Sequence, residues 1–171
     1  MAFYFPTKRL IIRPWRESDR PDFERMVLDP DMMRYINGRP WDDAQIDEFM
    51  QRQRHHMAQH GVCFGACQSI ESDAVIGLAG MQPIDSGEFE IGWWVWKDYW
   101  GQGLALEALQ PFLTHARNMG LGKLLAVIDP PNSASIRVAE KLGMHFDRTV
   151  PANQTIASRG DKLVAIYELT L

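Results

Sequence analysis

Two closely spaced glycines in this chain could bind a phosphate group. They lie in the run Trp100-Gly101-Gln102-Gly103-Leu104-Ala105, between a predicted strand and a predicted helix. Glycine lets the backbone approach a ligand, and a helix start directs free N–H groups and the positive end of its dipole outward, which suits a pyrophosphate. The run also fits a plain tight turn. It is neither a Rossmann fingerprint, which needs a third glycine, nor a P-loop, which needs Gly-Lys-Ser/Thr.

A second candidate site begins at Asn132. This residue follows two prolines and falls at a predicted helix N-cap, while Gly143 falls where a glycine commonly ends a helix. A well-capped helix explains both residues. It does not explain why Ser135 and Ala139, which share a helix face with Asn132, are small and weakly apolar.

Alternating strand and helix patterns position these two segments. Strands are predicted near residues 7–13, 62–70, 74–82, 88–97, 123–128, 144–150 and 162–169, and helices from Ser18 and over 42–60, 101–119 and 133–142. The polar segment 151–161 separates the last two strands. This order indicates a mixed α/β domain in which helices cover a largely antiparallel sheet.

Composition excludes several classes of protein. The chain has 171 residues, 46% apolar and 23% charged, which predicts a single globular domain over residues 1–171. A net charge of −4 argues against a nucleic-acid partner. No run approaches the ~20 apolar residues of a membrane-spanning helix, and the N-terminus lacks the pattern of a signal peptide. We therefore expect a cytoplasmic protein without a membrane partner.

The two cysteines, Cys63 and Cys67, lie four residues apart in a predicted strand. Their side chains would share a face about 13 Å apart, too far for a disulfide, so we expect reduced core thiols. No group of His and Cys residues has the spacing of zinc ligands, so no metal is expected.

Together, the two candidate sites resemble the GNAT superfamily of N-acetyltransferases, and within it the RimJ/RimL-like branch. The resemblance rests on the runs Glu90-Ile91-Gly92-Trp93-Trp94-Val95, 100–108, Asn132-x-x-Ser135 and Glu140-Lys141-Leu142-Gly143-Met144. It covers nearly the whole chain and is most specific over residues 88–146. It implies the GNAT fold, of the α/β class (mixed, α+β-like), with a central, largely antiparallel, splayed sheet of about seven strands flanked by about four helices.

The resemblance also implies that acetyl-CoA binds in the V-shaped opening of the sheet. Backbone groups around Val95 and Trp96 would pair with the pantetheine arm, and the amides of Gly101 to Ala105 would bind the pyrophosphate. Trp100 stands where the family carries Gln or Arg. That departure changes a side chain, whereas the phosphate contacts come mostly from the backbone.

The second run would complete the coenzyme site. The resemblance implies that Asn132 hydrogen-bonds the pantetheine and that Ser135 lies near the thiol. Arg137 and Lys141 could contact the 3′-phosphate of CoA, or they could form a solvated basic face.

Direct acetyl transfer requires that a protonated amine lose a proton. Glu90 is the candidate base, with Glu88 as its rival two positions earlier, and either also fits a solvated strand carboxylate. A strand-end amide near Val95 could stabilise the oxyanion. Many relatives carry a Tyr as general acid four residues after the position of Ser135. Here that position is Ala139, so Ser135, a water molecule or no acid must serve.

The acceptor site is expected beside the first two helices, with Tyr35, Ile36, Trp41 and the Asn37-Gly38 loop as its wall. The three tryptophans of the predicted strand 88–97, Trp93, Trp94 and Trp96, alternate between the two sides of the sheet. Those on one side should line the acceptor channel, and those on the other side should belong to the core. Acidic residues in this region favour a cationic amine: Asp31, Asp42, Asp43, Asp47 and Glu48.

The resulting hypothesis is an acetyl-CoA-dependent N-acetyltransferase that acts on a protein N-terminus or on a small-molecule amine. The alternative is a non-catalytic acyl-CoA-binding sensor or regulatory module, which Ala139 at the acid position makes conceivable. Exposed sheet edges in such folds make a homodimer plausible.

Overall fold

A computed structural model describes residues 3–171, which form five α-helices and one eight-stranded sheet. The strands are β1 (Phe5–Pro6), β2 (Leu10–Arg13), β3 (Phe64–Ser69), β4 (Val75–Pro83), β5 (Phe89–Val95), β6 (Lys123–Ile128), β7 (His145–Pro151) and β8 (Leu163–Thr170). The helices are α1 (Arg20–Val27), α2 (Pro30–Met33), α3 (Asp43–His60), α4 (Leu104–Asn118) and α5 (Ser133–Lys141). Short 3-10 helices are η1 (Glu17–Asp19), η2 (Lys97–Tyr99), η3 (Ala152–Gln154) and η4 (Ala157–Arg159).

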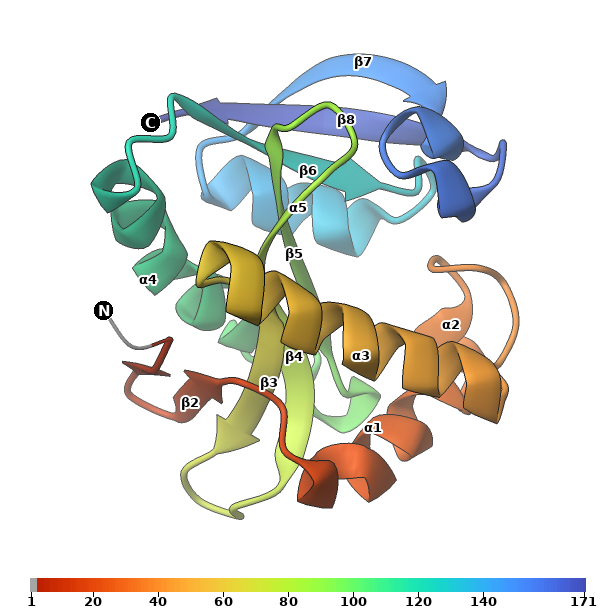
Figure 1. Ribbon diagram of the computed structural model, residues 1–171, viewed down its shortest axis with the longest axis vertical. Coiled ribbons are helices and arrows are strands. Elements are labelled where there is room, and N and C mark those ends of the chain that lie inside the picture. The colour runs from red at the N-terminus through yellow and green to blue at the C-terminus, as the bar shows by residue number, and fades with distance from the viewer. Residues whose placement is uncertain (1–2) are drawn as a thin grey trace.

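The sheet divides into two halves that diverge from a single contact. Its order is β1-β2-β3-β4-β5-β6-β8-β7, and neighbours are antiparallel except β5 and β6. These two parallel strands are in register only at Glu90 and Leu125, so β5 continues to Val95 without pairing to β6. Figure 1 shows the consequence, with β3, β4 and β5 running along the molecule while β6, β8 and β7 cross it at the top. The splayed sheet expected from the resemblance is confirmed.

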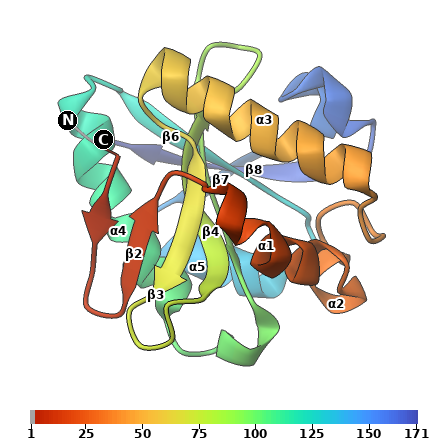
Figure 2. The ribbon, with the colours of Figure 1, turned by 60° about the horizontal axis from the view of Figure 1, so that its bottom comes forward.

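Helices cover both faces of the sheet. In Figures 1 and 2, α3 lies over one face of the strands β3–β5, while α4 and α5 lie on the other face. The long helix α3 begins where the Asp42 carboxylate accepts the Gln45 N–H, and it ends at Gly61, which adopts a left-handed φ of 69°. The local sequence therefore determines both ends of α3, the helix that faces the opening of the sheet.

Two short elements and one segment differ from the expected pattern. The strand β1 and the one-turn helix α2 were not predicted, and Asp29 is the N-cap of α2. The reason is local, because the Asp29 carboxylate accepts the N–H groups of Asp31 and Met32, and Pro30 occupies the first turn. The segment 151–161 folds as η3 and η4 and does more than separate two strands.

Two residues of the C-terminal strands differ in exposure. Tyr167 is in the core, and His145 is exposed on the edge strand β7. Within residues 3–171, no helix has both the length and the apolar character needed to cross a membrane. In the same range, no three His, Cys, Asp or Glu side chains gather in a way that could hold a metal ion.

Candidate functional site

The divergence of β5 from β6 opens a cavity of about 1040 Å³. Ligand pockets usually span about 300–1,000 Å³, so this space can hold a large ligand or two smaller ones. The predicted site residues that line it are Glu90, Val95, Gly101, Gly103, Leu104, Ala105, Asn132 and Ser135. The cavity therefore brings together both motifs and one of the two candidate bases.

The free edge of β5 forms one wall of the cavity. The Trp96 N–H donates to the Ile76 carbonyl at 2.7 Å, and Val95 lies opposite Gly77. Hydrogen-bonding direction alternates along an antiparallel strand, so the N–H and C=O of Trp93 and Val95 point away from β4. Because β6 has already diverged, these groups face the cavity. The Val95 carbonyl accepts the Trp100 indole N–H at 2.6 Å, so its N–H is the group that remains for a ligand.

Trp96 and Gln102 lie outside the cavity lining, unlike the other predicted coenzyme contacts. Both backbone groups of Trp96 are engaged, since its N–H binds the Ile76 carbonyl and its own carbonyl accepts the Tyr99 N–H at 2.9 Å. Its buried ring lies 4.8 Å below the Arg25 guanidinium. Trp96 therefore has no free backbone group for the expected pairing with the pantetheine arm, and Val95 is the last residue of β5 that lines the cavity. The exposed Gln102 amide donates a hydrogen bond to the Asp98 carbonyl at 3.4 Å.

The N-terminus of α4 has the features of an anion site. Gly101 and Gly103 adopt left-handed φ values of 76° and 75°, and both border open space. Gly103 is the N-cap of α4 and provides no side-chain cap. The N–H groups of Leu104 and Ala105 lie in the first turn, where no intrahelical acceptor exists, and the helix dipole adds partial positive charge. A phosphate at this turn would satisfy groups that the chain itself leaves without a partner.

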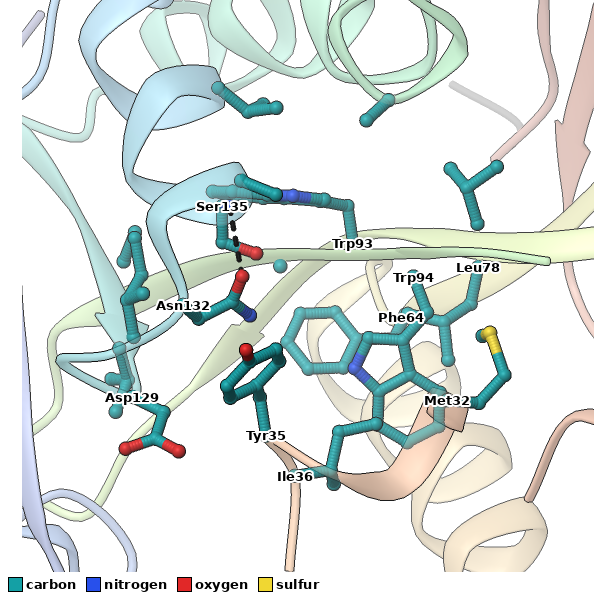
Figure 3. Close-up of a pocket in the computed structure, with 18 of the residues that line it drawn as sticks. Met32, Tyr35, Ile36, Phe64, Leu78, Trp93, Trp94, Asp129, Asn132 and Ser135 are labelled. Carbon is teal, nitrogen blue, oxygen red and sulfur yellow. Dashed lines mark hydrogen bonds between the residues drawn. The ribbon is translucent and has the colours of Figure 1, made fainter. Parts of the chain in front are cut away.

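Asn132 and Ser135 meet at the start of α5 on the opposite wall. The Asn132 Oδ1 accepts the Ser135 N–H at 3.1 Å and so caps the helix. Figure 3 shows the Asn132 amide nitrogen and the Ser135 hydroxyl directed into the cavity. The cap uses the oxygen of the Asn132 amide and leaves its nitrogen free for a ligand. Ala139 is fully buried and does not line the cavity.

Glu90 is a buried carboxylate at the point where the two strands part. Its Oε2 accepts hydrogen bonds from Arg159 Nη2 at 2.6 Å and from Gln82 Nε2 at 3.2 Å. Within residues 3–171, no hydrogen bond reaches Oε1. One oxygen is thus held by the protein, and the other is left for a ligand in the cavity that Glu90 lines.

Glu88 lies in a different environment. It forms an ion pair with Lys123 at 2.8 Å and accepts the Ser86 hydroxyl at 2.8 Å. The hydrogen bond from Lys123 lowers the pKa of Glu88 below its ordinary value. Glu88 does not line the cavity, so the structure distinguishes two carboxylates that the sequence left as alternatives.

Arg159 is a site residue that sequence reasoning missed. It lies in η4, in the polar segment before β8, and is 69 residues from Glu90 along the chain. Besides the ion pair to Glu90, its Nη1 donates to the Thr155 hydroxyl at 3.1 Å. No local sequence pattern predicts this contact, because Arg159 reaches β5 only through the folding of η3 and η4.

Aromatic side chains form the wall beside α2 and α3. Tyr35, Ile36, Asn37 and Trp41 line the cavity, as expected, whereas Gly38 does not. Figure 3 shows the Tyr35 hydroxyl directed toward Asn132 and Ser135 across the opening. Tyr35 was predicted only as part of the wall, but its position makes it a candidate proton donor.

The three tryptophans of the β5 region do not divide between channel and core as expected. Trp93 and Trp94 lie on opposite faces of β5, and both line the cavity because the splay exposes both faces there. Trp94 packs with its ring centre 5.7 Å from that of Trp41 and 6.0 Å from that of Phe49. Only Trp96 of the three is buried away from the cavity.

The charge argument for a cationic amine is weakened by the structure. Of the five acidic residues that suggested it, only Asp31 and Glu48 line the cavity. Asp43 and Asp47 contact Arg20, and Asp42 caps α3. Arginines Arg39, Arg52 and Arg159 line the same region, and Arg137 and Lys141 line the cavity near α5.

Both cysteines are buried and unpaired, as predicted. Burial raises the pKa of Cys63 to about 12 and raises that of Cys67 as well, so neither thiol supplies a nucleophilic thiolate. We expect the native protein to react negligibly with dithionitrobenzoate at pH 8 and to release two equivalents of thionitrobenzoate after denaturation. Rapid reaction of one equivalent in the native protein would contradict this assignment.

Comparisons with known proteins agree with one another. The family described as acetyltransferase (GNAT) domain matches residues 9–145. The chain is 32% identical to the uncharacterised protein YkkB of Bacillus subtilis over 95% of this chain and 92% of that protein. An acetyltransferase structure from Agrobacterium tumefaciens is similar, with a TM-score of 0.82, 24% identity and coverage of 98% and 94% of the two chains. RimL, a ribosomal α-N-protein acetyltransferase solved with coenzyme A, matches with a TM-score of 0.78, 18% identity and 98% coverage of both chains.

Proposed function

This chain belongs to the GNAT acetyltransferase family, and from that premise we propose that it transfers an acetyl group from acetyl-CoA directly to a primary amine. The observation that carries the proposal is the cavity between β5 and β6, which joins the free amides of α4 to the Glu90 carboxylate. We place the protein in the RimJ/RimL-like branch, and the acceptor is a protein N-terminus or a small-molecule amine.

Acetyl-CoA supplies the acetyl group as a thioester, and the residues of the cavity fit its chemistry. The first-turn N–H groups of α4 would bind the pyrophosphate. The outward-facing backbone of Trp93 and Val95 and the Asn132 amide nitrogen would bind the pantetheine arm. Arg137 and Lys141, which also line the cavity, would contact the 3′-phosphate.

Glu90 is proposed to accept the proton of the amine, directly or through a water molecule. Arg159 and Gln82 position the carboxylate through Oε2, so that Oε1 is directed to the acceptor. The Val95 N–H, further along β5, faces the cavity and would stabilise the negative charge that develops on the carbonyl oxygen. Glu90, Gln82 and Arg159 come from β5, β4 and η4, and hydrogen bonds join them in the folded protein.

Tyr35 is proposed to donate the proton that the departing thiolate requires, with Ser135 beside it, and to regain one from solvent. We expect Tyr35→Phe to lower kcat by about 10- to 100-fold, because a positioned proton donor is lost. The KM for acetyl-CoA should stay unchanged, as should the kcat of a Tyr4→Phe control at an exposed position outside the cavity. A change in the KM for the acceptor alone would instead indicate that Tyr35 contributes to acceptor binding and not to proton transfer.

The first test of the function is calorimetric titration with acetyl-CoA and CoA, followed by a thiol-release assay. The acceptors are peptides with free N-termini, polyamines and aminoglycosides. Binding with release for one class supports the proposal. Binding without release for any amine would support the alternative, a non-catalytic acyl-CoA-binding module, for which the buried Ala139 at the acid position is the supporting observation. Absence of binding would overturn both.

A further inference from the structure

Arg52 is a cation on the cavity wall that the proposed reaction does not use. It projects from α3 and lines the cavity together with Glu90 and Arg159. Its Nε is buried and has no hydrogen-bond partner among residues 3–171. Because that Nε is shielded from solvent, a ligand in the cavity would meet the Nη groups, at the end of a side chain that is 33% exposed and makes no hydrogen bond within residues 3–171.

The surroundings of Arg52 leave its charge poorly compensated. Its nearest carboxylate is Glu48, one turn earlier on α3, at 3.7 Å and with a side chain 67% exposed. Glu90 lies within electrostatic range, but its Oε2 is already bound by Arg159. Burial lowers the pKa of the Arg52 guanidinium, although arginine remains protonated at ordinary pH. Two arginines therefore share one buried carboxylate on this wall.

We propose that the acceptor is zwitterionic: its amine binds beside Glu90, and a carboxylate of the same molecule binds Arg52. This inference rests on the proposed acetyl transfer and narrows its substrate class. A guanidinium with free donors is the side chain best suited to a carboxylate, which it can bind through two parallel hydrogen bonds. Because Arg52 and Glu90 influence each other electrostatically and line one cavity, the amine and the carboxylate lie close together in the acceptor.

The coenzyme does not explain this arginine. The anion site for its pyrophosphate lies at the start of α4, on the face of the sheet opposite to α3 (Figures 1 and 2). The wall next to Arg52 is aromatic, and the Phe49 ring centre lies 5.7 Å from the guanidinium. This wall thus combines the Arg52 guanidinium, the Glu90 carboxylate and an apolar surface, which fits an amino acid or an N-terminal peptide segment with an acidic side chain.

The test measures binding, so that it does not depend on turnover. Matched compounds are titrated calorimetrically into the protein saturated with CoA: phenylalanine and methionine, their C-terminal amides, and alanyl-glutamate amide with alanyl-glutamine amide. We expect one acid to bind at least 10-fold more tightly than its uncharged partner. Arg52→Gln should remove that preference. Arg54→Gln, on the same helix but paired with Glu17 outside the cavity, should keep it.

The results distinguish the possible sources of the carboxylate, and they test the zwitterionic acceptor separately from the proposed acetyl transfer. Preference for the free amino acids assigns an α-carboxylate, and preference for the glutamate peptide assigns an acidic side chain. Equal binding of acids and amides, no binding of any acid, or a preference that survives Arg52→Gln would overturn the zwitterionic acceptor. Acetyl-CoA binding and thiol release with a carboxylate-free amine such as spermidine would then still stand, so the proposed function is judged independently.

Discussion

Replacing Glu90 with Gln is expected to lower kcat by about 100- to 10,000-fold, the usual contribution of a positioned general base. The amide keeps the size of the side chain and can still accept a hydrogen bond from Arg159, but it cannot take a proton from the amine. The Kd for acetyl-CoA should remain unchanged, because the coenzyme contacts that we propose come from the backbone of Trp93 and Val95, from α4 and from the start of α5, and not from the Glu90 side chain. Steady-state kinetics with the acceptor identified in the panel and calorimetry with acetyl-CoA measure the two quantities.

Glu88→Gln is the matched control for this variant. Glu88 lies one residue before β5 and forms an ion pair with Lys123, outside the cavity. Its replacement should leave kcat within about twofold and cost at most about 1 kcal/mol of stability, as is usual for partly exposed pairs. The reverse pattern, with Glu88→Gln inactive and Glu90→Gln active, would exchange the roles of the two carboxylates.

Replacing Gly103 with Val is expected to weaken acetyl-CoA binding by about 100-fold or more, roughly 3 kcal/mol. Gly103 has a φ of 75°, which a β-branched residue adopts only with strain. The open space around its Cα is the space that we assign to the pyrophosphate, and a valine side chain would enter it. The variant combines a displaced turn with a steric block at the first-turn amides of α4.

Gly87→Val separates loss of binding from loss of stability. Gly87 also has a left-handed φ, 84°, and also borders open space, but it lies in the turn before β5 and outside the cavity. Both variants should therefore lose similar amounts of thermal stability, while only Gly103→Val loses affinity for acetyl-CoA. Equal affinities of the two variants for acetyl-CoA would contradict the placement of the pyrophosphate at the start of α4.

The features that could be read from the sequence are those set by contacts between near neighbours in the chain. The N-cap at Asn132 is a hydrogen bond to the N–H three residues later, and the cap at Asp42 has the same spacing. Gly101 and Gly103 indicate left-handed backbone turns, because other residues avoid that conformation. Such short-range rules also gave the order of the main strands and helices, while the resemblance to one family rested on the motifs at residues 90–108 and 132–144.

Only the tertiary structure decided which charged groups act together. Glu90 and Glu88 have similar local sequence contexts, yet one lies beside Arg159 in the cavity and the other beside Lys123 outside it. Both partners lie more than thirty residues away along the chain, and no periodicity encodes their approach. In the sequence, Arg52 resembles any other cation on a helix surface. In the structure, its Nε is buried and has no hydrogen-bond partner within residues 3–171. Motifs within the sequence thus carried the resemblance to the family, whereas the roles that we propose for Glu90 and Arg52 depend on side chains that meet only after the two halves of the sheet have packed.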